Sequence, residues 1–128
     1  MKFILLLLLS FSVMADDSLA RFDYADGSGN VYHISPNLLE YKPITPNESS
    51  SGIYSGGEAV KKVLSVEDYQ HLITQVQTAM NNKTIQVEQR SMGSGMIVFY
   101  GNQQKTTVLL QQNAQEKQAL EIFLKTLR

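Results

Sequence analysis

Short runs in which apolar and polar side chains alternate predict β-strands in the first half of the chain. Residues 19–25 alternate in this way, and residues 31–34 form a second run of β-branched and aromatic side chains. Between them, residues 26–30 (Asp-Gly-Ser-Gly-Asn) accept positive φ angles at low steric cost, which predicts a β-hairpin. Residues 38–41 are a candidate third strand.

An irregular stretch follows, and it leads into an amphipathic helix. Pro43 and Pro46 end the pairing of the third strand, and a run of small and polar residues extends over 47–58. Ser65, with Asp68 three residues later, has the pattern of a helix N-cap. The apolar positions that follow recur as one helix face and predict a helix that ends near Asn82; they are 66, 69, 72, 73, 76, 79 and 80.

Three further strands and a closing helix are predicted from the second half. Residues 84–89 alternate and predict a strand with one exposed face. Residues 96–100 and 106–110 are continuous apolar runs, which are typical of central strands covered by helices on both faces. A hairpin loop, residues 101–105, joins them. A capping box at residues 113–116 then precedes an apolar stripe made of Ala119, Leu120, Phe123, Leu124 and Leu127.

Hairpin-joined strands and two one-sided helices together predict the fold class. We expect an α+β domain: a single antiparallel sheet of about five or six strands with two amphipathic helices packed on it. The sequence does not determine the strand order. Residues 16–128 are long enough for one domain, and we expect them to form a single small α+β domain.

The first fifteen residues have the layout of a secretory signal peptide. Lys2 is followed by an apolar run over residues 3–14, and Val13 and Ala15 place small side chains before Asp16. We therefore expect cleavage between Ala15 and Asp16, a secreted or periplasmic location, and no stable membrane insertion after cleavage.

Charge and composition argue against several classes of partner. The formal net charge is −1, and it becomes −2 once Lys2 leaves with the leader. Only Lys61 and Lys62 are adjacent cations, so the chain lacks the basic stripe that nucleic acids or anionic membranes require. With no cysteine and two histidines, we expect no metal site and no cofactor. Asp26 resembles the start of an EF-hand loop, but Asn37 stands where that loop needs a glutamate.

No catalytic motif is present at the required spacing. Neither Ser55 nor Ser94 has glycine two residues away on both sides, as a nucleophile elbow requires. A phosphate loop would need lysine where Glu58 follows Gly57. An enzyme would require His33 or His71 to approach a loop serine, and we keep a small hydrolase as the third alternative.

Recognition through two Ser/Gly-rich loops is the function that remains. Tyr54 is an aromatic side chain on an adaptable loop, a combination that suits protein contact. Residues 51–54 (Ser-Gly-Ile-Tyr) resemble the Ser-Gly-x-x-Tyr loop of periplasmic lysozyme inhibitors, although the spacing is one residue shorter and those all-β domains usually carry cysteines. The expected contact residues are Ser51, Gly52, Tyr54, Ser55, Gly56, Gly57, Ser91, Gly93, Ser94 and Gly95.

We therefore expect a non-catalytic secreted domain that binds an envelope or extracellular protein. The most specific version of this hypothesis is inhibition of a hydrolase. The alternative is a module that binds a small molecule or an envelope glycan in a cavity between sheet and helices. Tyr32, Tyr41 and Tyr100 would then line that cavity. The purely structural interpretation is that Tyr54 folds back onto the domain and the loops are only connectors.

Overall fold

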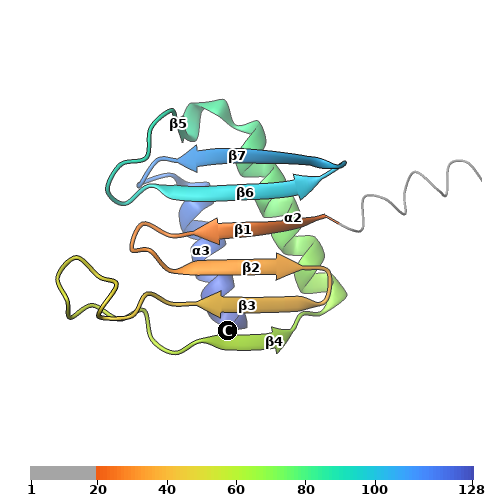
Figure 1. Ribbon diagram of the computed structural model, residues 1–128. Coiled ribbons are helices and arrows are strands. Elements are labelled where there is room, and N and C mark those ends of the chain that lie inside the picture. The colour runs from red at the N-terminus through yellow and green to blue at the C-terminus, as the bar shows by residue number, and fades with distance from the viewer. Residues whose placement is uncertain (1–19) are drawn as a thin grey trace, which may run out of the picture.

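A meander of four antiparallel strands forms the first half of the computed structural model, which describes residues 20–128 (Figure 1). The first hairpin turns at residues 26–30, as these residues predict, whereas the long segment 43–59 separates the last two strands. The strands are β1 (Arg21–Ala25), β2 (Val31–Ser35), β3 (Leu38–Lys42) and β4 (Val60–Val63). The predicted signal peptide and its cleavage site lie outside the described residues.

The second half contributes two helices and the rest of the sheet. Asn102 and Gln103 have positive φ angles of 53° and 61°, so they form the tight turn of the β6–β7 hairpin. The elements are α2 (Val66–Asn81), the 3₁₀ turn η1 (Lys83–Ile85), β5 (Gln86–Val87), β6 (Gly95–Gly101), β7 (Gln104–Leu110) and α3 (Gln115–Leu127).

All seven strands belong to one antiparallel sheet with the order β4-β3-β2-β1-β6-β7-β5. The α+β class and the single antiparallel sheet are therefore confirmed, although the strand number exceeds the five or six expected. β1 lies in the middle and joins the two halves of the chain, because it pairs with β2 on one side and β6 on the other. Arg21 is opposite Tyr100 in the second of these ladders.

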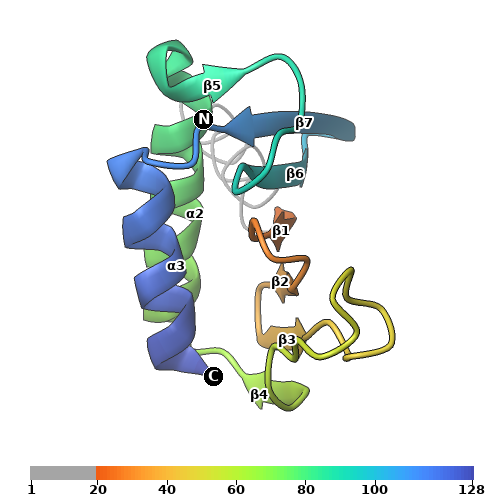
Figure 2. The same ribbon diagram turned by 90° about the vertical axis from the view of Figure 1, so that its left-hand side faces the viewer.

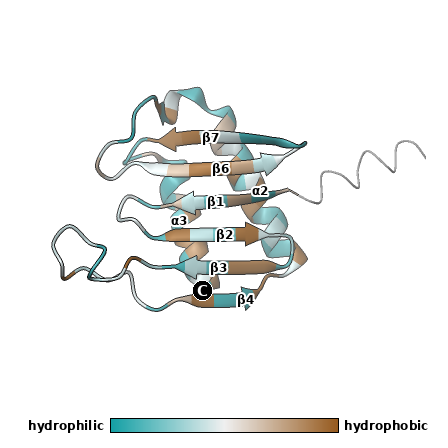
Figure 3. Cartoon of the chain, viewed as in Figure 1, coloured by the Kyte–Doolittle hydropathy of each residue, from teal (hydrophilic) through white to brown (hydrophobic). Residues whose placement is uncertain are grey.

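Both helices lie on the same face of the sheet, and the core lies between these two layers (Figure 2). Alternation along the strands, visible in Figure 3, directs every second side chain to this face. The largest core residues include Phe22, Tyr24, Ile34, Leu39, Leu72, Val76, Ile97, Leu110, Leu120 and Leu124.

The opposite face of the sheet is uncovered among residues 20–128, so the expectation that β6 and β7 are buried on both faces is wrong. The side chains on this face are mixed. Asp23 is opposite His33, His33 is opposite Glu40, and Glu40 is opposite Lys61. These residues form a polar row across four strands, which keeps this face compatible with water.

Two strand predictions need correction. β4 was not predicted, because its sequence Val-Lys-Lys-Val has only two apolar residues and lies at the sheet edge. The predicted strand over 84–89 is mostly absent: η1 takes Lys83–Ile85, and only Gln86–Val87 pair with β7. In η1 the Asn82 side chain accepts a hydrogen bond from the Thr84 amide, and this cap favours a helical turn over a strand.

The two helices begin differently. Ser65 caps α2 through a hydrogen bond from the Asp68 amide to its Oγ, as the sequence predicts. The capping box predicted for α3 is wrong, because its N-cap is Ala114, which offers no side-chain acceptor. Glu116 instead accepts a hydrogen bond from the Asn82 side chain, which links the end of α2 to the start of α3.

The helices of residues 20–128 are also short or mixed in polarity. Within this range we find none that combines the length and the apolar character needed to cross a bilayer.

Candidate functional site

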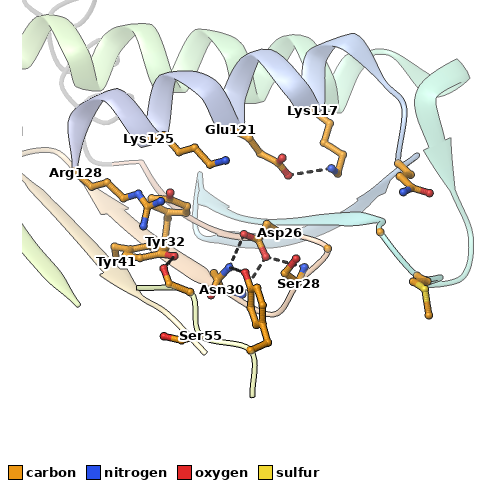
Figure 4. A pocket seen from close by; sticks show the side chains of 16 residues that line it. Asp26, Ser28, Asn30, Tyr32, Tyr41, Ser55, Lys117, Glu121, Lys125 and Arg128 are labelled. Carbon is orange, nitrogen blue, oxygen red and sulfur yellow. Dashed lines mark hydrogen bonds and ion pairs between the residues drawn. The ribbon is translucent and has the colours of Figure 1, made fainter. Parts of the chain in front are cut away.

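A cleft of about 500 Å³ lies between α3 and the ends of the central strands (Figure 4). α3 forms one wall. The β1–β2 turn, residues 54–56 and residues 92–93 form the other. Segments that are far apart in the sequence thus converge on one hollow, and both of the predicted contact loops contribute to it.

Not all of the predicted contact residues face this cleft. Four of them line it: Tyr54, Ser55, Gly56 and Gly93. Ser51, Gly52 and Gly57 are exposed on the outer part of the 43–59 segment. Ser91 is exposed beside the cleft, whereas Ser94 and Gly95 are buried and unavailable for contact.

The β1–β2 turn is organised by the carboxylate of Asp26. Its Oδ1 accepts hydrogen bonds from the amides of Ser28 (2.9 Å) and Asn30 (3.0 Å), and its Oδ2 accepts one from the Asn30 side chain (3.0 Å). A short polar side chain that bonds the backbone two residues on is the usual stabiliser of such turns. The oxygens that suggested a calcium loop are thus used within the turn.

Asn30 also anchors the long segment between β3 and β4. Its buried amide group accepts a hydrogen bond from the Ile44 amide (2.9 Å) and donates one to the Tyr54 hydroxyl (3.1 Å). A Cβ at Gly56 would lie 1.9 Å from Asn30 Oδ1, so only glycine permits this approach. The Tyr41 hydroxyl donates to the Gly56 carbonyl (2.6 Å). Residues 54–56 are therefore held against the turn.

The segment before β6 is held in a comparable way. Ser94 Oγ donates to the Ser91 carbonyl (2.7 Å), which closes a tight turn around Gly93. Gly93 has a φ of 82°, and its backbone approaches Gly27 so closely that a Cβ on Gly27 would lie 2.5 Å from it. Arg90 donates to the Asp26 carbonyl at 3.3 Å. The three loop segments thus form one connected wall.

Two tyrosines form the floor of the cleft. The rings of Tyr32 and Tyr41 are tilted against each other with centroids 4.7 Å apart, and the Arg128 guanidinium lies 4.1 Å from the Tyr41 centroid. Removal from water raises the pKa of Tyr32 to about 12, and it raises the pKa of Tyr41 as well. Both hydroxyls are therefore protonated, and able to donate, at neutral pH.

The α3 wall carries a half-buried ionic cluster. Glu121 accepts a hydrogen bond from the Tyr24 hydroxyl (2.5 Å) and forms an ion pair with Lys117 (3.0 Å), one helical turn away. Lys117 is only 6% exposed. Burial, with the Glu121 carboxylate second, raises the pKa of Tyr24 far above its usual range. Tyr24 is thus a permanent donor that orients the carboxylate.

The histidines lie elsewhere. His33 Nδ1 is 2.6 Å from Asp23 Oδ1 on the uncovered sheet face, and the His71 ring lies against Phe123 with centroids 4.3 Å apart. Neither histidine lines the cleft with the loop serines. Tyr100 also lies away from the cleft, in a separate hollow beside Arg21. Among residues 20–128, no three histidine or acidic side chains gather closely enough to hold a metal ion.

Sequence reasoning missed the α3 wall. Lys117, Glu121, Lys125 and Arg128 line the cleft and recur at intervals of three or four residues. This spacing places them on one stripe beside the apolar face of the helix. The signal was present in the sequence, but a polar stripe on an amphipathic helix is normally its solvated side.

Comparisons with known proteins add no family. No protein-family model matches the chain, and neither the curated proteins nor the solved structures give a match. Functional proposals therefore rest on the geometry of the site alone.

Proposed function

We propose that the protein is a non-catalytic binding module whose cleft takes a small polar ligand, such as a sugar or another small molecule of the cell envelope. One observation carries this proposal: α3, the β1–β2 turn and both Ser/Gly-rich loops converge on a single cleft of about 500 Å³. That volume lies in the range of roughly 300–1,000 Å³ typical of small-molecule sites.

The construction of the walls supports the proposal. Asn30, Asp26 and Gly56 hold the loop wall in place through hydrogen bonds and close contacts, so the cleft exists without a ligand. Preformed sites retain more of their binding energy, because less entropy is lost when the ligand arrives. Hydroxyl, amide and ammonium groups line the cleft, and these groups favour a polar ligand.

The leader sequence suggests where such a ligand is found. If residues 1–15 act as a signal peptide, the binding module is secreted or periplasmic, and its ligand belongs to the envelope or the medium. Mass spectrometry of the exported protein tests this part: a mature N-terminus at Asp16 supports it, and retention of residues 1–15 contradicts it.

Amide chemical shifts measured by NMR during a screen of polar small molecules test the cleft. We expect some compounds to shift the amides of residues 54–56 and of α3 together. Ser55→Trp places a bulky ring at the cleft and is expected to abolish these shifts. Ser51→Trp is the matched control, because Ser51 is on the same segment outside the cleft. If no compound shifts these amides, the proposal fails.

A second function, contact with a protein partner, is favoured by two exposed apolar side chains. Ile53 is 84% exposed and Met92 is 94% exposed, and they come from the two loop segments that flank the cleft. Tyr54 contributes less than its sequence context suggests, because Asn30 donates to its hydroxyl. The partner would be an envelope or extracellular protein, and inhibition of a hydrolase remains the sharpest form of this function.

A capture experiment from envelope extract separates this function from ligand binding. Ile53→Ser with Met92→Ser is expected to weaken capture of a specific protein about tenfold, since a few side chains that become buried on binding carry most of the energy of an interface. Val63→Ser is the control, because Val63 is 89% exposed but lies on the edge strand β4. Equal capture by both variants would eliminate the loop interface.

A further inference from the structure

The charges around the cleft do not balance once each one is matched with its partner. Asp26 lines the cleft, but its carboxylate already accepts three hydrogen bonds from Ser28 and Asn30. These donors are neutral, so Asp26 keeps its negative charge, but three of the roughly four acceptor sites of its carboxylate are already used. Asp26 is therefore a structural group, and it does not make the cleft a cation site.

Glu121 is paired through one of its two oxygens. Its Oε2 accepts from the Tyr24 hydroxyl and pairs with Lys117, and both partners are buried, whereas Oε1 has no hydrogen-bond partner within residues 20–128. The opposite charges of Glu121 and Lys117 lie 3.0 Å apart, so the pair as a whole has no net charge. Lys117 and Glu121 thus cancel each other, and neither supplies net charge to a ligand.

Two cations on the last turns of α3 remain. Lys125 and Arg128 both line the cleft, and neither forms an ion pair with an acidic side chain among residues 20–128. Figure 4 shows Arg128 reaching from α3 to Tyr32 and Tyr41 on the floor of the cleft, while Lys125 lies along the α3 wall with its ammonium group toward Glu121. Arg128 is positioned over the Tyr41 ring, a contact that restrains its guanidinium group.

The Tyr32 hydroxyl is the third group directed at the same place. It lines the cleft and has no hydrogen-bond partner among residues 20–128, whereas the Tyr41 hydroxyl donates to Gly56. Tyr32 is otherwise 3% exposed, so its ring is fixed by the core. The cleft therefore offers one oriented neutral donor below two cationic donors.

We propose that the ligand of this cleft carries an anionic group, a carboxylate or a phosphate, bound by Lys125, Arg128 and the Tyr32 hydroxyl. This inference rests on the proposed binding function and names the class of ligand. Charge-assisted hydrogen bonds from an arginine and a lysine are the usual means of holding such groups. The neutral part of the ligand then faces the polar loop wall around Tyr54 and Ser55.

Matched pairs of probes test the inference. We would titrate glucose against glucuronate, glycerol against glycerol 3-phosphate, and inorganic phosphate alone, following amide shifts in the cleft. The anionic member of a pair is expected to bind about tenfold more tightly or better. Lys125→Gln with Arg128→Gln is expected to remove this preference, as is raising the salt concentration. Tyr32→Phe should weaken binding of the anionic probe by a smaller factor.

Lys61→Gln with Lys62→Gln is the control, because it removes the same charge from β4, outside the cleft. A rival role for Lys125 and Arg128 is to stabilise the negative end of the α3 dipole. In that case Lys125→Gln with Arg128→Gln lowers the melting temperature but leaves any preference between probes unchanged, which overturns the inference.

The results distinguish a failure of the proposed ligand class from a failure of the proposed binding function. If neutral probes bind in the cleft as tightly as their anionic partners, the ligand class is wrong and the binding function stands. If the anionic probes, and every compound of the wider polar screen, leave the cleft amides unshifted, both proposals fail together.

Discussion

Asn30 is the residue on which the candidate site most depends. Its side chain is 4% exposed and bonds Asp26, Ile44 and Tyr54, so one amide group connects its own turn to two points of the 43–59 segment. Both its donor and its acceptor atoms are used. An aspartate at this position would lose the side-chain donor, and a leucine would lose every side-chain hydrogen bond. Asparagine supplies both the donor and the acceptor.

Replacing Asn30 with alanine is expected to loosen the loop wall. The Ile44 amide and the Tyr54 hydroxyl lose their partner, and we expect the free energy of unfolding to fall by about 2 kcal/mol. Hydrogen exchange should accelerate at the Ile44 and Gly56 amides. Asn47→Ala, at an exposed position in the same segment, should change neither. Unchanged protection of Ile44 in Asn30→Ala would show that the segment is held by other contacts.

Buried tyrosines make the stability sensitive to alkaline pH. Burial raises the pKa values of four tyrosines above 10.0, the value of an exposed phenol. At a pH between 10.0 and the raised pKa, the phenol keeps its proton in the folded chain but loses it in the unfolded chain. The stability that these residues contribute is therefore complete below pH 10 and falls above it, by at most about 1.4 kcal/mol per pH unit for each residue, until the pH reaches the raised pKa of that residue. These residues are Tyr24, Tyr32, Tyr41 and Tyr69.

Denaturant unfolding measured from pH 8 to pH 11.5 tests this expectation. Tyr32→Phe removes one titrating group without removing a hydrogen bond within residues 20–128, so its stability should fall less steeply above pH 10. If the free energy of unfolding falls equally steeply with pH in the variant and the parent, ionisation of Tyr32 does not contribute to the loss of stability at alkaline pH.

For single residues, the sequence predicts which types of side chain the candidate site contains better than it predicts where each side chain lies. Of the contact residues that it predicts, Tyr54, Ser55, Gly56 and Gly93 line the cleft; they were selected because small and polar loop residues are typical of binding sites. It also selected Ser94 and Gly95, which are buried for reasons of packing. The contribution of Lys125 and Arg128 depends on which side of α3 faces the loops, and that follows only from the tertiary arrangement.

Among the elements, the helices α2 and α3 differ at their N-termini, and this difference is testable. Ser65→Ala removes the cap of α2 and should lower the free energy of unfolding by about 1 kcal/mol. Ala114→Ser should raise it by a similar amount, because the new hydroxyl can accept from the Lys117 amide.

Thermal and denaturant unfolding of the two variants measures both effects, with Ser51→Ala as a control outside any helix. A destabilised Ala114→Ser variant would show that the packing around this 6% exposed position outweighs the gain of a cap.

The sequence predicted the element types well wherever the pattern was long. α2 and the strands β1, β2, β3, β6 and β7 follow from periodicity and turn chemistry. It failed at β4 and β5, where two to four residues pair at a sheet edge and the neighbouring strand decides the conformation. It also failed to show that both helices lie on one face, because an apolar run in a strand does not reveal what covers it.

At the scale of the whole molecule, the sheet has an uncovered face and an exposed edge at β4. Lys61 and Lys62 lie on that edge, and charged residues on edge strands oppose pairing between molecules. Lys61→Val with Lys62→Val is therefore expected to increase self-association. Sedimentation at increasing protein concentration measures it.

Lys83→Val with Lys125→Val is the matched control, since it removes equal charge outside the strands. Equal association of the two double variants would attribute the effect to net charge and not to the edge of the sheet.

The ladder between β1 and β6 has a consequence for the order in which the molecule folds. β2 follows β1 at once, whereas β6 is synthesised only after α2 is complete. The pairing of Arg21 with Tyr100 closes a long loop, and pairings of this kind slow folding. A growing chain therefore presents one unpaired side of its central strand until residue 100 has emerged. During that interval, a chaperone or a second nascent chain can occupy the place that β6 later takes.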